Sequence, residues 1–274
     1  PFPENLQLAM EMETIVKNNG AVPSTIGLLN GKIIVGMDND QLKSLVDHKD
    51  TIKVSSRNIG LGVAHKLSGG TTVAGTLVVC RTVGIPVFAT GGIGGVHRGS
   101  TFDISADLDE LARSPVIVVC AGAKAILDLP ATLEALETRG IPVIGYQTDE
   151  FPAFYSISSG LPVDFNASNP QEIAEIARKH WELGLKSALL VCVPPPAKVA
   201  LDAKEVQEIL EKAIVQAKRS GVSGSRVTPY LLDQIKELTH GKSRIANLEL
   251  LHNNAIVAAQ IAVQLSGKSG VVNF

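Results

Sequence analysis

The sequence predicts an α/β protein: a single mixed, mostly parallel sheet flanked by helices, with a helical segment at the C-terminal end. Short continuous apolar runs recur along the middle of the chain, each followed by a helical pattern, and this β-α-β rhythm is typical of a parallel sheet. Loops rich in glycine or other small residues leave two of these runs, at Gly91 to Gly99 and at Ala121 to Lys124. Because we find no internal repeat and no clear domain boundary, we expect residues 1–274 to form one domain.

The first part of the chain predicts a helix, a hairpin and shorter elements. Asn5 to Lys17 has an apolar face at helical spacing, and Asn18-Asn19-Gly20 ends that helix. Asn30-Gly31 is a two-residue hairpin signal between strand-like segments at 21–29 and 32–37. The other elements expected here are a helix at 38–47, an extended piece at 52–54, and helices at 60–66 and 71–83 separated by Gly69-Gly70.

The rest of the chain alternates strands with helices. The expected strands are the apolar runs Ile85 to Thr90, Val116 to Cys120, Val143 to Tyr146 and Ser187 to Val193. The expected helices are 108–113, one that begins at Lys124, 130–139, 170–183, 203–220, 229–239 and 245–265. Because parallel sheets bind ligands beyond the carboxyl ends of their strands, the loops 91–99 and 121–124 should share one crevice if their strands are neighbours.

Composition excludes several classes of protein. The chain has 274 residues, 45% of them hydrophobic, and a net charge of −2, so it can bury a core but offers no basic surface for nucleic acid. No apolar run approaches the roughly 18 residues that span a membrane, and no signal peptide pattern is visible. Cys80, Cys120 and Cys192 lie in apolar segments without metal-ligand spacing, which is typical of buried reduced thiols. We therefore expect an intracellular protein, cytoplasmic or organellar, that binds neither nucleic acid nor membrane.

The loop from Gly91 to Gly99 has the character of a phosphate or phosphosugar site. Glycines after a strand let backbone N–H groups approach an anion closely, although a tight turn without a ligand is the alternative. A dinucleotide fingerprint would require glycine or alanine where His97 stands, which argues against a nicotinamide-dependent dehydrogenase. His97 together with Arg98 is a candidate phosphate pair.

Lys124 is the candidate nucleophile. It follows an apolar strand and the small-residue turn Ala121-Gly122-Ala123, at the expected start of a helix. An apolar pocket and a positive helix end both favour the neutral amine, which can attack a carbonyl and form a Schiff base. A solvated lysine at a helix start is the alternative.

Further polar residues lie near these loops. Asp103 and Asp107 are spaced by one helical turn, so they could share a divalent cation held largely by water, or position a sugar hydroxyl. A structural role for both is equally compatible with the spacing. Weaker candidates, each with a structural alternative, are Lys53, Thr72, Asn253 and Asn254.

Together these motifs resemble the pseudouridine-5′-phosphate glycosidase family. The resemblance rests on Phe88 to Gly99, Asp103 to Leu108 and Ala121 to Lys124, with supporting matches at 19–23, 145–148 and 253–255, and it covers nearly the whole chain. It implies an enzyme that reversibly cleaves the C–C glycosidic bond of pseudouridine 5′-phosphate to uracil and ribose 5-phosphate. It also implies a divalent metal, typically Mn²⁺, and a homotrimer.

The resemblance implies roles for individual residues. Lys124 matches the nucleophile that forms an adduct at C1′ of the ring-opened sugar, and the iminium accepts electrons as the protonated uracil carbon leaves. Two-carboxylate glycosidase chemistry does not suffice, because a C–C bond has no leaving oxygen to protonate. Asp103 matches the metal ligand. The matching or plausible substrate contacts are Lys53, Thr72, Val73, His97, Ser105, Ala106, Asp107, Asn253 and Asn254.

One part of the family pattern lies outside the printed sequence. The family's proton-donating glutamate belongs to a Glu-Ser-Thr segment ahead of the region that matches Pro1-Phe2-Pro3, and we expect the intact protein to have it. The join from Gly99 to Phe102 is also shorter than the family pattern. A catalytically inactive phosphosugar-binding protein of the same fold is therefore the alternative hypothesis.

Overall fold

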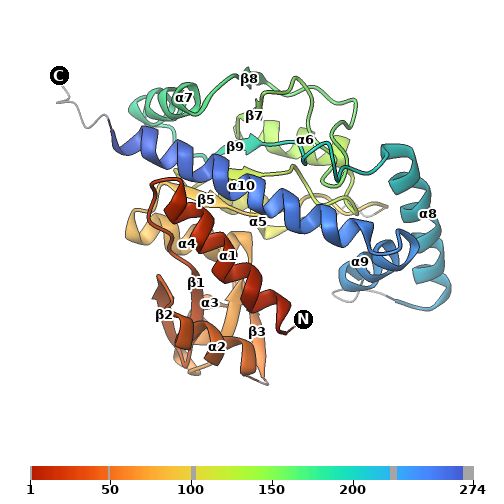
Figure 1. Cartoon of the computed structure of the whole chain (residues 1–274), viewed down its shortest axis with the longest axis horizontal. Coiled ribbons are helices and arrows are strands. Elements are labelled where there is room, and N and C mark those ends of the chain that lie inside the picture. Colours follow the sequence, from red (N-terminus) through yellow and green to blue (C-terminus); the bar gives the residue numbers. More distant parts are fainter. Residues whose placement is uncertain (1, 49, 100–102, 223–226, 268–274) are drawn as a thin grey trace.

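Two sheets organise the chain in the computed structural model, which describes residues 2–48, 50–99, 103–222 and 227–267 (Figure 1). The join at 100–102 therefore lies outside the described residues. The smaller sheet has the order β2-β1-β4-β3 and the larger one β5-β6-β9-β7-β8. The α/β class, with a parallel sheet flanked by helices, is confirmed, but the strands form two sheets rather than the single sheet that the sequence predicted.

The strands of the smaller sheet are β1 (Ile26–Leu29), β2 (Lys32–Val35), β3 (Thr51–Val54) and β4 (Ser68–Thr71). Those of the larger sheet are β5 (Val87–Ala89), β6 (Ile117–Cys120), β7 (Val143–Tyr146), β8 (Phe165–Ala167) and β9 (Leu189–Cys192). The helices are α1 (Glu4–Asn18), α2 (Asn39–Asp47), α3 (Ile59–Ala64), α4 (Val73–Val83), α5 (Ala106–Leu111), α6 (Leu129–Thr138), α7 (Pro170–Glu182), α8 (Ala203–Arg219), α9 (Val227–Leu238) and α10 (Lys242–Ser266).

The smaller sheet exists because a glycine-rich strand, β4, joins the N-terminal hairpin to β3. The hairpin is confirmed: Asn30 and Gly31 turn with φ of 50° and 77°, and β1 and β2 pair antiparallel. Gly69 and Gly70 were expected to separate two helices, and glycine is depleted in strands. Instead they lie in β4, where a Cβ on Gly69 would stand 2.0 Å from the carbonyl oxygen of Ile52 on β3. Only glycine permits this approach between strands.

The larger sheet is fully parallel and has helices on both faces. Ile117 and Val119 of β6 pack with α7 and α10, whereas the alternate residues Val118 and Cys120 belong to the cluster that includes α5, α6 and α8. Burial on both faces explains why these strands are continuous apolar runs. The strand β8 was missed because its Phe165 is exposed and its Asn166 is polar, so no apolar run marks it.

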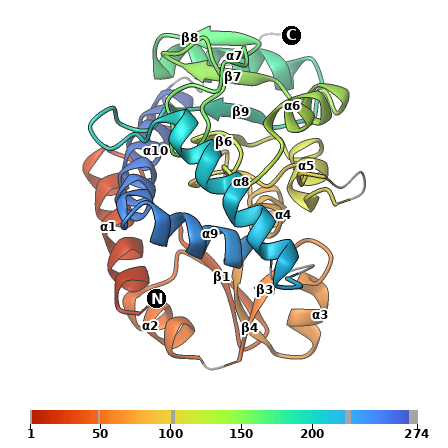
Figure 2. The same ribbon diagram turned by 90° about the vertical axis from the view of Figure 1, so that its right-hand side faces the viewer.

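The long helix α10 packs against α1, α7, β5 and β6 and runs across the molecule from the side of α7 to the side of α9 (Figure 1). The helices α8 and α9 pack against each other at one side, and α9 also meets α10 (Figure 2). Within the described residues, every helix is too short or too polar to cross a bilayer.

Candidate active site

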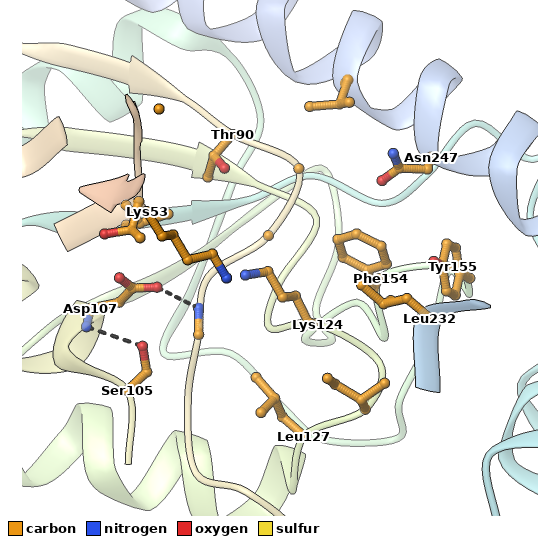
Figure 3. Close-up of a pocket in the computed structure, with 18 of the residues that line it drawn as sticks. Lys53, Thr90, Ser105, Asp107, Lys124, Leu127, Phe154, Tyr155, Leu232 and Asn247 are labelled. Carbon is orange, nitrogen blue, oxygen red and sulfur yellow. Dashed lines mark hydrogen bonds between the residues drawn. The ribbon is translucent and has the colours of Figure 1, made fainter. Parts of the chain in front are cut away.

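A cleft of about 760 Å³ opens where the carboxyl ends of β3 and β4 face those of β5 and β6 (Figure 3). Its wall includes residues from both the 91–99 loop and the loop that carries Lys124. The prediction that these loops share one crevice is confirmed, because β5 and β6 are parallel neighbours, with Phe88 opposite Val118.

Most of the predicted site residues reach this cleft. Those that line it are Lys53, Thr72, Val73, His97, Ser105, Ala106, Asp107 and Lys124. Those that do not line it are Asp103, Asn253 and Asn254.

Lys124 is held in a loop and not at the start of a helix, so the predicted helix beginning at this residue is wrong. The next helix, α6, begins at Leu129 with Asp128 as its N-cap. The Lys124 backbone N–H donates to the carbonyl of Ile93 (3.1 Å), which ties the two loops together. Its side chain is half-buried, and its amine points toward that of Lys53 (Figure 3).

The surroundings of Lys124 favour its neutral form. Burial lowers the pKa of Lys124, the Asp107 carboxylate opposes that effect, and the positive charge of Lys53 adds to it. The net pKa lies below that of a free lysine. The amine is therefore a better nucleophile than a solvated lysine. Of the two causes that the sequence suggested, burial applies and the helix dipole does not.

Asp107 braces the site through its two carboxylate oxygens. It is 5% exposed, and Oδ1 accepts from the N–H of Ala74 while Oδ2 accepts from the N–H of Gly94, each at 2.8 Å. It thereby fastens the first turn of α4 to the glycine loop, and a Cβ on Gly94 would fall 2.2 Å from the Ser105 hydroxyl.

The idea that Asp103 and Asp107 share a helix face is wrong, because α5 begins at Ala106, after its N-cap Ser105. Asp103 lies in the extended segment before that helix, where its carbonyl accepts from the N–H of His97 (2.9 Å). Its exposed carboxylate oxygen Oδ2 is 3.9 Å from His97 Nδ1. Within the described residues, no three His, Cys, Asp or Glu side chains gather as a metal cage.

The predicted phosphate pair of His97 and Arg98 is also wrong. Arg98 does not line the cleft: its Nε donates to the carbonyl of Leu127 (3.0 Å) and Nη2 to Gln207 on α8 (3.2 Å). Neighbouring residues in an extended loop point to opposite sides, so only His97 faces the cleft.

Asn253 and Asn254 support the cleft from behind. Asn254 is fully buried in α10, and its amide donates to the carbonyl of Thr90 (2.8 Å), where β5 enters the glycine loop. The amide of Asn253 donates to the carbonyl of Pro194 at 3.4 Å. These contacts give Asn254 a structural role in placing Thr90, which itself lines the cleft.

Sequence reasoning missed one end of the cleft. The residues there come from the 151–156 loop, α9 and α10, and they are Phe154, Tyr155, Leu232, Asp233, Lys236, Ser243, Arg244, Asn247 and Leu251. The run Phe151-Pro152-Ala153-Phe154-Tyr155 is an unusual cluster of aromatic residues, but no spacing in the sequence connects it with Asn247. Burial raises the pKa of Tyr155 to about 12, so its hydroxyl stays protonated.

The cleft thus has a polar end and an aromatic end, and the charged residues of α9 and α10 line the cleft beside the aromatic side chains. Lys53, Ser105 and Asp107 lie at the polar end, and Phe154 and Tyr155 lie at the aromatic end near Asn247 (Figure 3). Lys124 stands between them. A ligand with an anionic sugar at one side and a flat ring at the other would match this distribution.

Comparisons with known proteins find similarity over nearly the whole chain. A family model described as "Indigoidine synthase A like protein" matches residues 1–264. The chain is 51% identical to the pseudouridine-5′-phosphate glycosidase of Caldanaerobacter subterraneus subsp. tengcongensis over 268 residues, which is 97% of this chain and 87% of the relative. It is also 51% identical to the enzyme of that name from Mycoplasmopsis agalactiae, covering 96% of this chain and 88% of the relative.

Two solved structures share the fold. The prealnumycin C-glycosynthase AlnA, solved in complex with ribulose 5-phosphate, has a TM-score of 0.91 at 37% identity, covering 95% of this chain and 87% of AlnA. An indigoidine synthase A-like protein from Thermotoga maritima has a TM-score of 0.90 at 38% identity, covering 97% of this chain and 88% of that one.

Proposed function

The chain belongs to the indigoidine synthase A-like family, in which its relatives are pseudouridine-5′-phosphate glycosidases, and on this premise we propose that it is such a glycosidase. It cleaves the C–C glycosidic bond of pseudouridine 5′-phosphate reversibly, giving uracil and ribose 5-phosphate. The observation that carries this assignment is the position of Lys124, whose lowered pKa and place between a polar and an aromatic end fit a nucleophile at C1′.

The charges in the cleft suggest how the substrate lies. The phosphate occupies the polar end, near Lys53 and the N-terminus of α4, where Thr72 caps the helix by accepting from the N–H of Gly75 (3.1 Å). A helix N-terminus and a lysine both favour an anion. The ribose lies along Ser105 and Ala106, and uracil extends toward the aromatic end.

Covalent chemistry at Lys124 then breaks the C–C bond. The neutral amine attacks C1′, the ring C1′–O4′ bond breaks, and O4′ takes a proton to become a hydroxyl. The nitrogen pair next forms a C1′=N iminium while the electrons of the C–C bond pass to the uracil carbon, which is protonated. Water hydrolyses the iminium, releasing ribose 5-phosphate and restoring the amine. Once the C1′–O4′ bond has broken, the ring oxygen can no longer stabilise positive charge at C1′, so the nitrogen of Lys124 provides the electron pair that replaces the C–C bond.

We also propose that Asp103, next to His97 at the cleft edge, binds a divalent ion such as Mn²⁺. One carboxylate beside an imidazole fits an ion that is held mainly by water and by substrate oxygens. When bound, the ion would polarise a substrate oxygen. Asp103→Asn should lower the affinity for Mn²⁺, measured by calorimetry without substrate. We further propose a homotrimer, which sedimentation equilibrium would test.

The central test is Lys124→Ala, assayed by uracil release from pseudouridine 5′-phosphate. We expect turnover to fall by more than about 10³-fold, because the covalent route is removed. Borohydride with ribose 5-phosphate should add one reduced sugar phosphate to the native protein and none to the variant, as seen by mass spectrometry.

Lys179→Ala is a suitable control, because this lysine lies on the exposed surface of α7, where it pairs with Glu182 (2.9 Å) and interacts with the charge of Glu175. Undiminished turnover in Lys124→Ala would rule out the mechanism. Native protein that binds ribose 5-phosphate but never releases uracil would instead identify a phosphosugar-binding protein without catalysis.

A further inference from the structure

We propose that Phe154 is the platform on which the leaving nucleobase stacks, and that its backbone is shaped to hold the ring in that place. This inference rests on the proposed function and assigns the aromatic end of the cleft to one component of the substrate. The ring lies beside Lys124 and faces the region of Asn247 (Figure 3).

The backbone of Phe154 is the first observation. Its φ of 63° lies in the left-handed region, which is unfavourable for a residue with a bulky side chain and is ordinarily left to glycine. Its N–H donates to the carbonyl of Ala121 (3.1 Å), in the loop that carries Lys124. Strained residues persist where the surrounding structure holds them, and they concentrate at functional sites.

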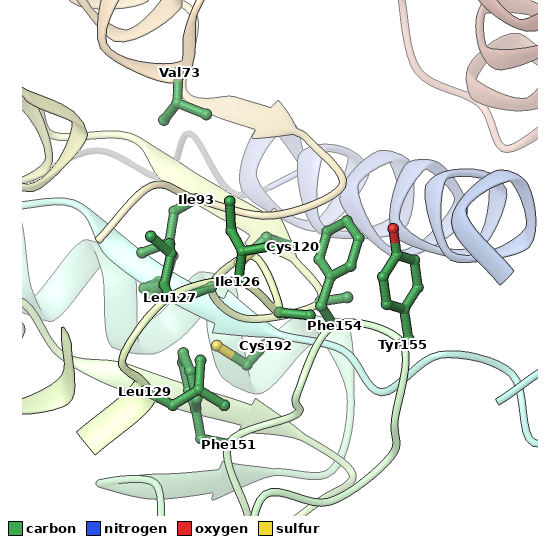
Figure 4. Packing of buried hydrophobic residues seen from close by; sticks show 14 of the residues in the cluster. Val73, Ile93, Cys120, Ile126, Leu127, Leu129, Phe151, Phe154, Tyr155 and Cys192 are labelled. Atoms are coloured by element: carbon green, nitrogen blue, oxygen red, sulfur yellow. The ribbon is translucent and has the colours of Figure 1, made fainter. Parts of the chain in front are cut away.

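The seat of the ring is the second observation. A Cβ added to Gly92 would stand 2.7 Å from both Cδ2 and Cε2 of Phe154, so the ring lies directly against the glycine loop. On another side, the ring of Tyr155 meets it edge-to-face, with centroids 4.7 Å apart and an interplanar angle of 79° (Figure 4). These contacts leave the ring little freedom, which is what a preorganised stacking surface requires.

The remaining exposure is the third observation. Phe154 is 6% exposed, and that small surface lines the cleft. Phe151, in the same loop, is completely buried and does not line the cleft. A side chain that only fills the core would need neither the left-handed backbone nor a surface in the cleft, as Phe151 illustrates.

Phe154→Leu tests the platform, because it should weaken the binding of uracil and leave the reaction with ribose 5-phosphate nearly unchanged. In the direction of synthesis, at saturating ribose 5-phosphate, KM for uracil should rise about 5- to 160-fold, the range for losing one base–aromatic stack. Borohydride trapping of ribose 5-phosphate on Lys124 should stay within about twofold of native, because the proposed sugar position along Ser105 and Ala106 lies away from the ring. Phe154→Trp should restore most of the uracil affinity.

Two further variants keep the test decisive if Phe154→Leu folds poorly. Gly92→Ala keeps the phenylalanine but displaces its ring, so it should raise KM for uracil in the same way. Phe151→Leu shortens a neighbouring core side chain and should leave KM for uracil unchanged.

Unchanged KM for uracil in both Phe154→Leu and Gly92→Ala would overturn the proposal. So would an equal loss of trapping and uracil affinity, which would indicate a general packing role. If native protein neither releases uracil nor traps ribose 5-phosphate, the proposed function itself fails, and the inference fails with it.

Discussion

Asp107→Asn is the perturbation that best tests how the site is held together. The Asp107 carboxylate is nearly buried and accepts one backbone N–H on each oxygen, from Ala74 and from Gly94, both at 2.8 Å. Asparagine keeps one acceptor and turns the other oxygen into an NH₂ group that faces an N–H donor. One charge-assisted hydrogen bond is lost and a buried N–H is left unsatisfied, so the free energy of unfolding should fall by about 2–4 kcal/mol.

Urea denaturation at neutral pH measures this loss as a shift in midpoint at constant slope. Asp109→Asn is the matched control on the same helix. Its exposed carboxylate pairs with Arg139 at 2.7 Å, and breaking an exposed pair costs less than about 1 kcal/mol. If Asp107→Asn were within about 0.5 kcal/mol of native, the carboxylate would not be the brace between α4 and the glycine loop.

Three other perturbations have definite expected results. Lys53→Met should raise the pKa of Lys124, because a neighbouring positive charge is removed. The pH midpoint for labelling Lys124 with a small neutral acylating reagent should therefore move upward. A midpoint that is unchanged or lower would contradict the electrostatic coupling. Burial of Glu110 acts to raise its pKa, but its hydrogen bond and charge contact with Arg113, together with Ser56 and Arg81, outweigh that effect and leave the pKa lowered. A carboxyl group whose pKa is lowered in the folded state stabilises the protein at pH values above its unfolded-state pKa, near 4.5. Glu110→Gln should therefore lower the free energy of unfolding by roughly 2 kcal/mol at neutral pH. Urea titrations should show this difference from the native protein shrinking as the pH falls through the folded-state pKa. Gly122→Ala should be more destabilising in thermal melts than Gly140→Ala, since both have positive φ but only at Gly122 would the Cβ meet an atom, the Pro152 carbonyl oxygen at 2.3 Å; equal losses would mean that this packing is relaxed.

Local sequence patterns were sufficient to predict the elements whose burial or backbone geometry leaves a mark in their own residues. The central strands of the larger sheet could be predicted because a strand covered on both faces is a continuous apolar run, as at Val116 to Cys120. The Asn30-Gly31 hairpin could be predicted because two positive φ angles demand such residues. The same logic identified the glycine loop and Lys124 as neighbours, since parallel strands end at one edge.

Other features depend on contacts between distant segments. The glycines of β4 look like a break between helices until β3 approaches to a distance at which a Cβ on Gly69 cannot fit. The carboxylate of Asp107 looks equally suited to a metal or to a brace until Ala74 and Gly94 bring their N–H groups to it. The spacing of residues along the chain does not predict these contacts between distant segments.

The sequence by itself therefore predicted the α/β class and the crevice, because these follow from periodicity and from residue types next to one another, and its resemblance to a known family singled out Lys124 as the proposed nucleophile. Only the tertiary structure decided how Lys124 is activated: by burial and Lys53 in a loop, and not by a helix dipole. It alone revealed the aromatic end, where Phe154 and Asn247, from separate elements, line the same part of the cleft. The burial of a side chain and the approach of residues from distant elements both depend on packing, and packing is defined only by the complete fold.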